Sequence, residues 1–155
     1  HGHVKDRWGV RFVRLHAGGL AIRRLRPEDF EAVLALLRQL PGSRASRSRE
    51  GFARIFQALL DGEGQEAFVA TLRHWIVGFV SLYYLDVLHH GGRVASIQEL
   101  VVTAELRGRG IGRALIEFAR ARAKERHCTG TELALGLSGL EGRFAYPGRV
   151  LVLGV

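Results

Sequence analysis

The sequence predicts an α/β (α+β) fold in which helices flank a mixed, mostly antiparallel central sheet. The expected elements run in the order β-α-α-β-β-β-α-β-(α)-β, and the middle of the chain is an antiparallel meander rather than a strict alternation of strands and helices. A chain of 155 residues has the size of one domain. We expect an atypical arm or an expression remnant over residues 1–19 and a single domain over residues 20–155.

The first half of the chain predicts one strand followed by two helices. Residues 20–26 have the composition of a strand. Pro27 then suits a first helical position, and the acids Glu28 and Asp29 suit the positive end of a helix dipole. Apolar residues keep helical spacing as far as Leu40, and a polar, basic loop leads to a second helix over 50–61.

The second half changes to strand periodicity and contains one long helix. Val, Ile, Phe and Tyr are enriched in two runs separated by a turn at His74, and Gly91 and Gly92 lie in a hairpin turn. The expected elements are strands at 67–72, 75–88 and 93–103, a helix at 110–126, a strand at 131–137, a short helix at 140–146 and a strand at 150–155. A further short strand is expected at 10–15.

The composition excludes several classes of protein. The only cysteine, Cys128, forms neither an internal disulfide nor a cysteine-rich zinc site, and no apolar run reaches the length of a membrane span. We therefore expect a soluble, cytoplasmic protein with no membrane association. The net charge of +8 favours an anionic partner, which could be nucleic acid, a membrane surface or a phosphorylated cofactor. The sequence has no helix-turn-helix or zinc-ligand spacing that would support nucleic-acid binding, so nucleic acid is not expected as a partner.

A glycine-rich segment at the start of the long helix is the most informative stretch. Gly108, Gly110 and Gly112 follow a strand and open a helix, where unpaired N–H groups and the helix dipole attract an anion such as a pyrophosphate. Arginines are interleaved with these glycines and add positive charge. The segment lacks the Gly-Lys-Ser/Thr of a P-loop and the spacing of a dinucleotide fingerprint.

The run Arg-Gly-Arg-Gly-Ile-Gly at residues 107–112 resembles the R/Q-x-x-G-x-G/A signature of the GNAT superfamily of acyl-CoA N-acyltransferases. Residues 99–102 are similar to the fourth strand of that family, and the order of elements resembles it over residues 20–137. Residues 97–102 and 131–133 also look like aminoalkylphosphonate acetyltransferases and related small-amine enzymes.

This resemblance implies an N-acetyltransferase that moves an acetyl group from acetyl-CoA to a primary amine of a small molecule, by direct attack in a ternary complex. Main-chain groups near the end of the fourth strand would contact the pantetheine arm, often at a β-bulge, and one N–H would polarise the thioester carbonyl. The residues implied to bind coenzyme A are Leu100, Val101, Val102, Arg107, Gly108, Arg109, Gly110, Ile111, Gly112 and Arg113. Many proteins of this resemblance pair as homodimers, and a homodimer is one of the states open to this chain, whose sequence does not fix the oligomeric state.

Glu99 is the candidate catalytic base, because a protonated amine must lose a proton before it attacks. A period of two puts Ile97, Glu99 and Val101 on one face of the strand, and Gln98, Leu100 and Val102 on the other. The alternative is a structural role for Glu99, in an ion pair with Arg93 or Arg73.

Tyr146 is the candidate acid that protonates the leaving thiolate, although Ala145 separates it from Phe144 where the family has adjacent aromatics. His89 and His90 lack further ligands at metal-binding spacing, so no metal site is expected. The basic run at 44–49 is either a solvated face or part of a lid over the acceptor. Two other functions stay open: a non-catalytic acyl-CoA-binding regulatory domain and a nucleic-acid-binding module.

Overall fold

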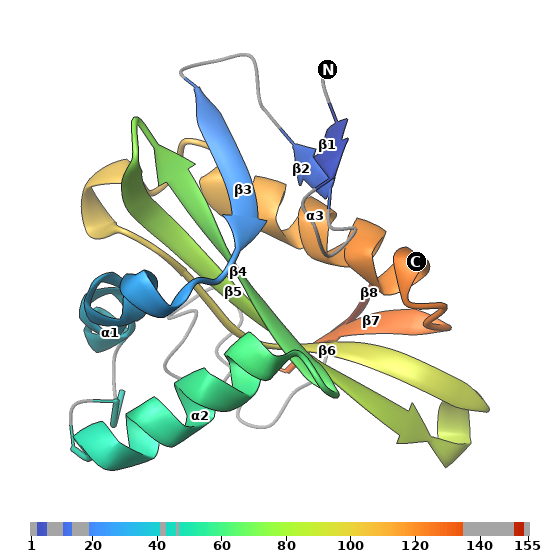
Figure 1. Ribbon diagram of the computed structural model, residues 1–155. Helices are drawn as coiled ribbons and strands as arrows, with labels where there is room; N and C mark the ends of the chain where they lie inside the picture. The colour runs from blue at the N-terminus through green and yellow to red at the C-terminus, as the bar shows by residue number, and fades with distance from the viewer. Residues whose placement is uncertain are drawn as a thin grey trace.

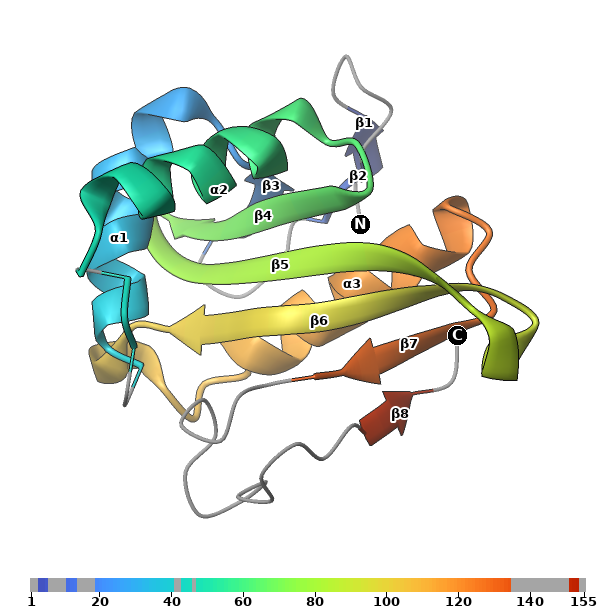
Figure 2. The ribbon, with the colours of Figure 1, turned by 90° about the horizontal axis from the view of Figure 1, so that it is seen from below.

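A twisted six-stranded sheet forms the centre of the computed structural model (Figures 1 and 2). The structure describes residues 3–5, 11–13, 19–40, 43–45, 47–134 and 151–153. The strands follow one another in chain order, and every neighbouring pair is antiparallel except β6 and β7. They are β3 (Leu20–Arg24), β4 (Gln65–Leu72), β5 (Trp75–Val87), β6 (Gly92–Val102), β7 (Gly130–Leu133) and β8 (Leu151–Leu153). The predicted mixed, mostly antiparallel sheet is confirmed.

Helices cover both faces of this sheet (Figure 2). A 3₁₀ turn, η1 (Pro27–Asp29), leads into α1 (Phe30–Arg38), which packs with α2 (Arg49–Asp61) on one face around a core that includes Val33, Phe56 and Phe79. The other face packs against α3 (Ile111–Glu125). Gly78 of β5 permits this packing, because a Cβ there would lie only 3.0 Å from Cδ1 of Leu115.

The observed elements follow the sequence pattern closely, with small differences at their ends. The helix expected at 50–61 begins one residue earlier, because Ser48 accepts a hydrogen bond from the N–H of Gly51 and caps α2. The strand expected at 131–137 is observed as Gly130–Leu133. Two further 3₁₀ turns, η2 (Leu88–His90) and η3 (Ala104–Leu106), flank β6. The short helix expected at 140–146 lies outside the described residues.

A separate two-stranded antiparallel sheet forms near the N-terminus. It joins β1 (His3–Lys5), which the sequence analysis did not anticipate, to β2 (Arg11–Val13), which lies within the expected strand at 10–15. None of the helices in the described ranges is long and apolar enough to cross a membrane.

A β-bulge in β6 corrects the predicted assignment of side chains to faces. Ser81 of β5 pairs with Glu99, but the next residue, Leu82, pairs with Ile97, so Gln98 is an extra residue in β6. Ile97 therefore packs in the α3 core together with Leu100, whereas Val101 packs in the core of α1 and α2. Glu99 and Val101 share the face of α1 and α2 as expected, but the expectation that Ile97 lies on that face was wrong, because the inserted residue reverses the alternation between Ile97 and Glu99.

The bulge also lies where the sheet opens. The parallel pairing of β6 with β7 ends at Ile97 and Leu133, with a last hydrogen bond from the N–H of Ala134 to the carbonyl of Ile97 at 2.9 Å. Beyond this point β6 continues to Val102 and, among the described residues, pairs only with β5. The last five residues of β6 thus have one edge outside the sheet ladder.

A buried cluster of charges fixes the far end of α3. The carboxylate of Glu66 is inaccessible to solvent and accepts two hydrogen bonds from Arg122, each 2.9 Å, and one from the hydroxyl of Tyr84 at 2.7 Å. Arg24 and Arg126 also form ion pairs with it, at 2.9 and 3.2 Å. Burial acts to raise the pKa of Glu66, but the hydrogen bonds from Arg122 and Tyr84 outweigh it and hold the pKa below its ordinary value.

Replacing Glu66 by Gln should lower the free energy of unfolding by roughly 3–5 kcal/mol, because it leaves buried guanidinium groups without a counter-charge. The loss is measured by urea denaturation at pH 7. Glu31→Gln, which removes an exposed carboxylate paired with Arg49, is the matched control and should cost under about 1 kcal/mol.

The pH dependence of the free energy of unfolding, compared between wild type and Glu66→Gln, gives a second readout. Because the folded pKa of Glu66 is lowered, its contribution is complete above the pKa of an unfolded glutamate, about 4.3, and is lost as the pH falls through the folded value. The stability difference between wild type and Glu66→Gln should therefore narrow in acid. An equal difference at pH 7 and at acid pH would contradict this account.

Candidate active site

The glycine-rich segment forms an open cradle at the N-terminus of α3. Gly110 is the N-cap residue in the left-handed region (φ 89°), and no side chain caps the helix. Among the described residues, no acceptor is bonded to the N–H groups of Ile111 and Gly112, and the first helical hydrogen bond is from Ala114 to the carbonyl of Gly110 at 3.0 Å. These amides and the helix dipole are available to an anion.

The surroundings of the cradle are open and positively charged. A Cβ built on Gly108 or Gly110 would meet no heavy atom within 4 Å, so a ligand can approach the main chain there. Arg107, Arg109 and Arg113 are all exposed around it. A diphosphate group matches this donor set, because its charges meet both unpaired amides and guanidinium groups.

The open edge of β6 lies beside this cradle. A Cβ on Gly112 would be 3.7 Å from Cγ2 of Val102, so the first turn of α3 lies against the end of β6. The N–H of Thr103 donates to the carbonyl of Val77 on β5 at 2.8 Å. Orientation alternates along an antiparallel pair, so the main-chain groups of Leu100 and Val102 point away from β5, while those of Val101 point toward it. The Nε of Arg107 donates to the carbonyl of Val102 at 3.2 Å, from that outer edge.

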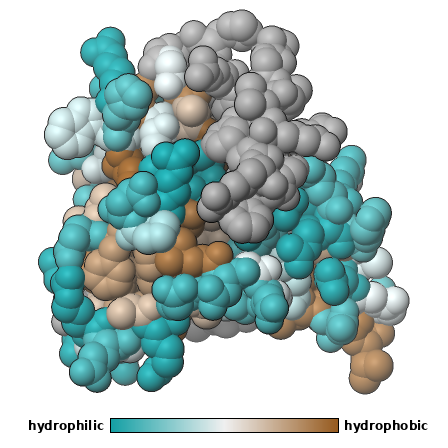
Figure 3. Space-filling view, in the orientation of Figure 1, coloured by the Kyte–Doolittle hydropathy of each residue, from teal (hydrophilic) through white to brown (hydrophobic). Residues whose placement is uncertain are grey.

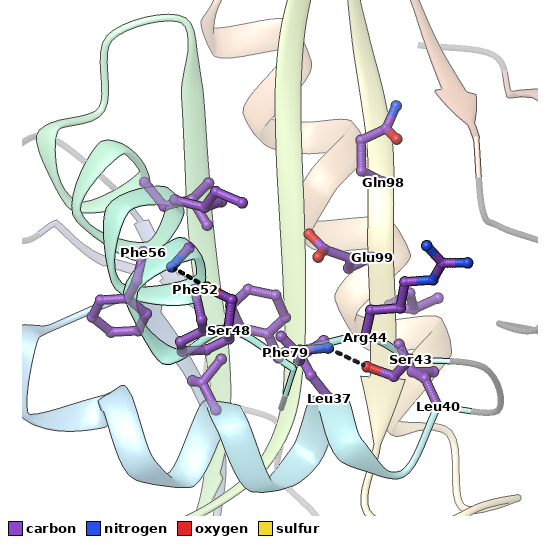
Figure 4. Close-up of a pocket in the computed structure, with 16 residues that line it drawn as sticks. Leu37, Leu40, Ser43, Arg44, Ser48, Phe52, Phe56, Phe79, Gln98 and Glu99 are labelled. Carbon is purple, nitrogen blue, oxygen red and sulfur yellow. Dashed lines mark hydrogen bonds between the residues drawn. The ribbon is translucent and has the colours of Figure 1, made fainter.

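A pocket of about 470 Å³ lies on the opposite side of β6, between the sheet and the two N-terminal helices (Figure 4). Apolar side chains form most of its wall, among them Leu37, Phe52, Phe56 and Phe79. In Figure 3, hydrophobic residues gather on the face near α1 and α2 within a hydrophilic surround. Three aromatic residues of the lining, Phe52, Phe56 and Phe79, form a phenylalanine cluster. Glu99 also lines this pocket, and Figure 4 shows its carboxylate on the side of that cluster.

Ser81 holds Glu99 in place through two hydrogen bonds. Its buried hydroxyl accepts the N–H of Glu99 at 3.1 Å and donates to Oε1 of the carboxylate in a short contact. Among the described residues no arginine forms an ion pair with Glu99, so the predicted alternative of a pair with Arg93 or Arg73 was wrong. Arg93 lies at the far end of β6, opposite Asp86, and Arg73 lies in the turn before β5.

Three further polar side chains divide between the pocket side of the sheet and the side of α3. Arg44 lines the pocket, as the predicted lid role requires. Burial and the nearby charge of Glu99 raise the pKa of Tyr83, which keeps its phenol neutral beside that carboxylate. Tyr84 points to the other face and binds Glu66. Tyr146 lies outside the described residues.

Cys128 and the pair His89 and His90 are two further features that the sequence analysis considered. Burial raises the pKa of the Cys128 thiol, which keeps it protonated and disfavours a nucleophilic role. His90 contacts Glu132 at 3.1 Å, and no cluster of three metal-ligating side chains occurs in the described part of the chain.

Sequence reasoning missed two residues that support the site. Ser81 lies in an apolar strand with no local pattern that identifies its partner, since Glu99 is 18 positions away. The side-chain oxygen of Gln39, at the end of α1, accepts the N–H of Ala104 at 2.9 Å and ties the acceptor side of the site to the segment leading to the cradle. Neither contact has a signal in local sequence spacing.

An anion cradle at a helix start, beside the free edge of a sheet strand that carries a pocket-facing carboxylate, defines an enzyme that binds an acyl-CoA. Comparison with known proteins agrees: residues 21–140 match the model of the acetyltransferase (GNAT) family. This chain belongs to the GNAT acetyltransferase family. The family uses acetyl-CoA as its acetyl donor, and the chain is an N-acetyltransferase.

Individual relatives show how far the similarity extends. The aminoalkylphosphonate N-acetyltransferase of Salmonella typhimurium is 33% identical over 119 residues, which are 75% of this chain and 74% of that enzyme. The ribosomal-protein-alanine N-acetyltransferase of Brucella melitensis has a TM-score of 0.63 and 26% identity, over 83% of this chain and 88% of that one. A transcriptional regulator of Bacillus halodurans has a TM-score of 0.66 and 27% identity, over 80% and 84%.

Replacing Gly110 by Leu should abolish detectable binding of coenzyme A in calorimetry. The side chain would occupy the open approach to the amides, and the positive φ is unfavourable for any residue with a Cβ. Gly91→Leu is the matched control, since Gly91 also has a positive φ (65°) and open surroundings but lies in the β5–β6 hairpin. Equal coenzyme affinity in the two variants would refute the cradle.

Replacing Ser81 by Ala should lower kcat by about tenfold or more while coenzyme affinity stays unchanged. The change removes both hydrogen bonds that hold Glu99, and it costs about 1–3 kcal/mol of stability because the N–H of Glu99 loses its acceptor. A thiol-release assay measures kcat, and calorimetry measures the affinity for coenzyme A. Ser81→Thr, which retains a hydroxyl, should recover part of the rate if its extra methyl group is accommodated.

Proposed function

We propose that this enzyme transfers an acetyl group from acetyl-CoA to the primary amine of a small molecule, which attacks directly in a ternary complex. The observation that carries this proposal is the position of Glu99. Its carboxylate lines an apolar pocket, and its neighbours in sequence present main-chain groups at the open edge of β6. An amine in the pocket is therefore on one side of β6 and close to the edge where the acyl donor is expected.

The chain offers a suitable set of groups for coenzyme A. The unpaired amides at the start of α3 and the surrounding arginines fit a diphosphate, and the outer edge of Leu100 and Val102 offers N–H donors and carbonyl acceptors to a peptide-like arm. Bound acetyl-CoA supplies the activated acetyl group as a thioester. The remaining proposed coenzyme contacts are Arg107, Gly108, Arg109, Gly110, Ile111, Gly112 and Arg113. The main-chain groups of Val101 point toward β5, so Val101 is left out of the set expected from the sequence.

Glu99 acts as the site for the substrate ammonium group and accepts its proton. A carboxylate at the end of an apolar pocket attracts a cation strongly, because there is little water to compete. Proton removal exposes the nitrogen lone pair that attack requires. The hydroxyl of Ser81 fixes the rotamer of this side chain, so the carboxylate meets each substrate in one orientation.

The amides of Leu100 and Val102 are the candidates for stabilising negative charge on the carbonyl oxygen that is attacked. They point away from β5 in the stretch where β7 no longer pairs with β6. A fixed N–H donor of this kind typically contributes about 3 kcal/mol to a transition state. Tyr146 is retained as the proposed proton donor to the leaving thiolate on the strength of the sequence resemblance.

The proposed acceptor class also draws on a relative. The Salmonella typhimurium enzyme that is 33% identical is described as an aminoalkylphosphonate N-acetyltransferase, which is a small-amine enzyme. The size of the pocket, about 470 Å³, suits an acceptor of that scale.

Replacing Glu99 by Gln should reduce kcat/KM for a primary amine by about 10²–10⁴-fold, the usual contribution of general acid–base catalysis, without weakening coenzyme A binding. Thiol release in the presence of an amine panel measures the first quantity, and calorimetry the second. Glu63→Gln removes an exposed carboxylate outside the pocket and is the charge-matched control.

Two other results would redirect the proposal. Unchanged turnover in Glu99→Gln would exclude Glu99 as the base and leave an ordered water relay as the route for the proton. Tight coenzyme binding with no thiol release for any amine in the panel would instead favour a non-catalytic acyl-CoA-binding domain.

A further inference from the structure

The pocket that Glu99 lines has a predominantly apolar wall. Its wall consists mostly of aliphatic and aromatic side chains from α1, α2, the connection between them, β5 and β6: Val33, Leu37, Leu40, Ala45, Phe52, Ile55, Phe56, Leu59, Phe79 and Leu100. The aromatic part is ordered by ring packing, with Phe52 and Phe56 at 6.0 Å between centroids and Phe30 edge-on to both at 5.0 and 5.2 Å. A rigid apolar wall of this kind favours a hydrophobic ligand body.

Most of the polar groups in the lining already have partners within the protein. The Ser43 hydroxyl accepts the N–H of Ala45 at 3.3 Å, and the Ser48 hydroxyl caps α2 at 2.9 Å. The amide of Gln98 donates to Ser96 at 2.9 Å. Glu99 and Arg44 are the two charged residues of the lining in the part of the chain that the structure describes, so they decide which ionic groups this wall accepts.

The two charged residues face different regions. In Figure 4 the carboxylate of Glu99 points toward the phenylalanine cluster, whereas the guanidinium of Arg44 points away from that cluster and lies over β6. Arg44 is exposed, and nearby Arg49 is engaged with Glu31 and stacked on the ring of Phe30 at 4.9 Å. Among the described residues, the aromatic end of the pocket therefore presents a negative charge and no cation.

This charge pattern opposes a strongly anionic acceptor. A phosphonate or phosphate group needs several N–H donors or guanidinium groups to replace its hydration. At the aromatic end of the pocket it would meet apolar carbon and the carboxylate of Glu99 instead, and Arg44 supplies a single guanidinium that points away from that end. An ammonium group with an uncharged hydrophobic substituent satisfies both features of the lining.

We infer that the acceptor is a primary amine bearing an uncharged, aryl-sized hydrophobic group, which packs on Phe52, Phe56 and Phe79 while its ammonium group binds Glu99. This inference rests on the proposed acceptor role of the pocket. It makes Phe52, at the half-buried margin of the phenylalanine cluster, a residue that determines specificity.

The test uses three amines that share an aminoethyl group and differ at one position: ethylamine, 2-phenylethylamine and 2-aminoethylphosphonate. Binding to the coenzyme A-loaded protein is measured by calorimetry, and acetyl transfer from acetyl-CoA by thiol release. We expect 2-phenylethylamine to bind at least about tenfold more tightly than the other two and to show the highest kcat/KM, since even one methylene group in an apolar pocket changes discrimination by that factor.

Two variants locate the preference within the pocket. Phe52→Ala should reduce the ratio of kcat/KM for 2-phenylethylamine over ethylamine by about fivefold or more, in keeping with lost aromatic contact. Trp75→Ala truncates an aromatic side chain that is 77% exposed and outside the pocket, and it should leave the ratio unchanged. Because each ratio is measured within one protein sample, a change in the folded fraction cancels.

The outcomes separate this inference from the proposed function. Tighter binding of 2-aminoethylphosphonate, or affinities for ethylamine and 2-phenylethylamine within threefold of each other, would overturn the inference while leaving acetyl transfer intact. Failure of 2-phenylethylamine to bind at millimolar concentration would overturn it as well. Binding of 2-phenylethylamine in the expected order without transfer of acetyl to any amine would support the pocket assignment and sink the proposed function.

Discussion

The antiparallel pairing of β5 with β6 contains a bulge with one extra residue in β6, and the arrangement of the site depends on the position of that residue. Gln98 has no partner in β5, so Glu99 is turned to the pocket side and is held there by Ser81. Beyond Ile97, β6 pairs only with β5 in the described part of the chain, so the main-chain groups of Leu100 and Val102 lie at its outer edge. The carboxylate proposed to bind the acceptor and the edge proposed to bind the donor thus lie directly beside one bulge.

The large excess of arginine has two separate uses in the described part of the chain. Three guanidinium groups, from β3 and α3, surround the single carboxylate of Glu66 inside the protein. Three others are exposed around the start of α3, where the unpaired amides already attract an anion. The positive net charge therefore includes arginines at the proposed coenzyme site and arginines in a buried structural cluster. By itself it indicates neither nucleic acid nor a membrane as a partner.

Local patterns were sufficient to predict most of the fold. Pro27 and the acids after it mark the start of α1, and alternation marks the antiparallel strands, because these signals act between near neighbours. The cradle was also visible, since its glycines and arginines are contiguous. The bulge at Gln98 was not, because a period of two has no local signal for an inserted residue, and Ile97 was therefore assigned to the wrong face. Ser81, Gln39 and the phenylalanine cluster needed the tertiary structure, since their partners come from distant segments.

The anchoring of α3 at its far end has a consequence for ligand affinity. Arg122 and Arg126, in and just after its last turn, are fixed to Glu66, while Leu115 and Phe118 pack the middle of the helix on the sheet. The helix is therefore already fixed before any ligand arrives. An anion that reaches its first amides loses little affinity to conformational entropy, because the protein has met that cost during folding.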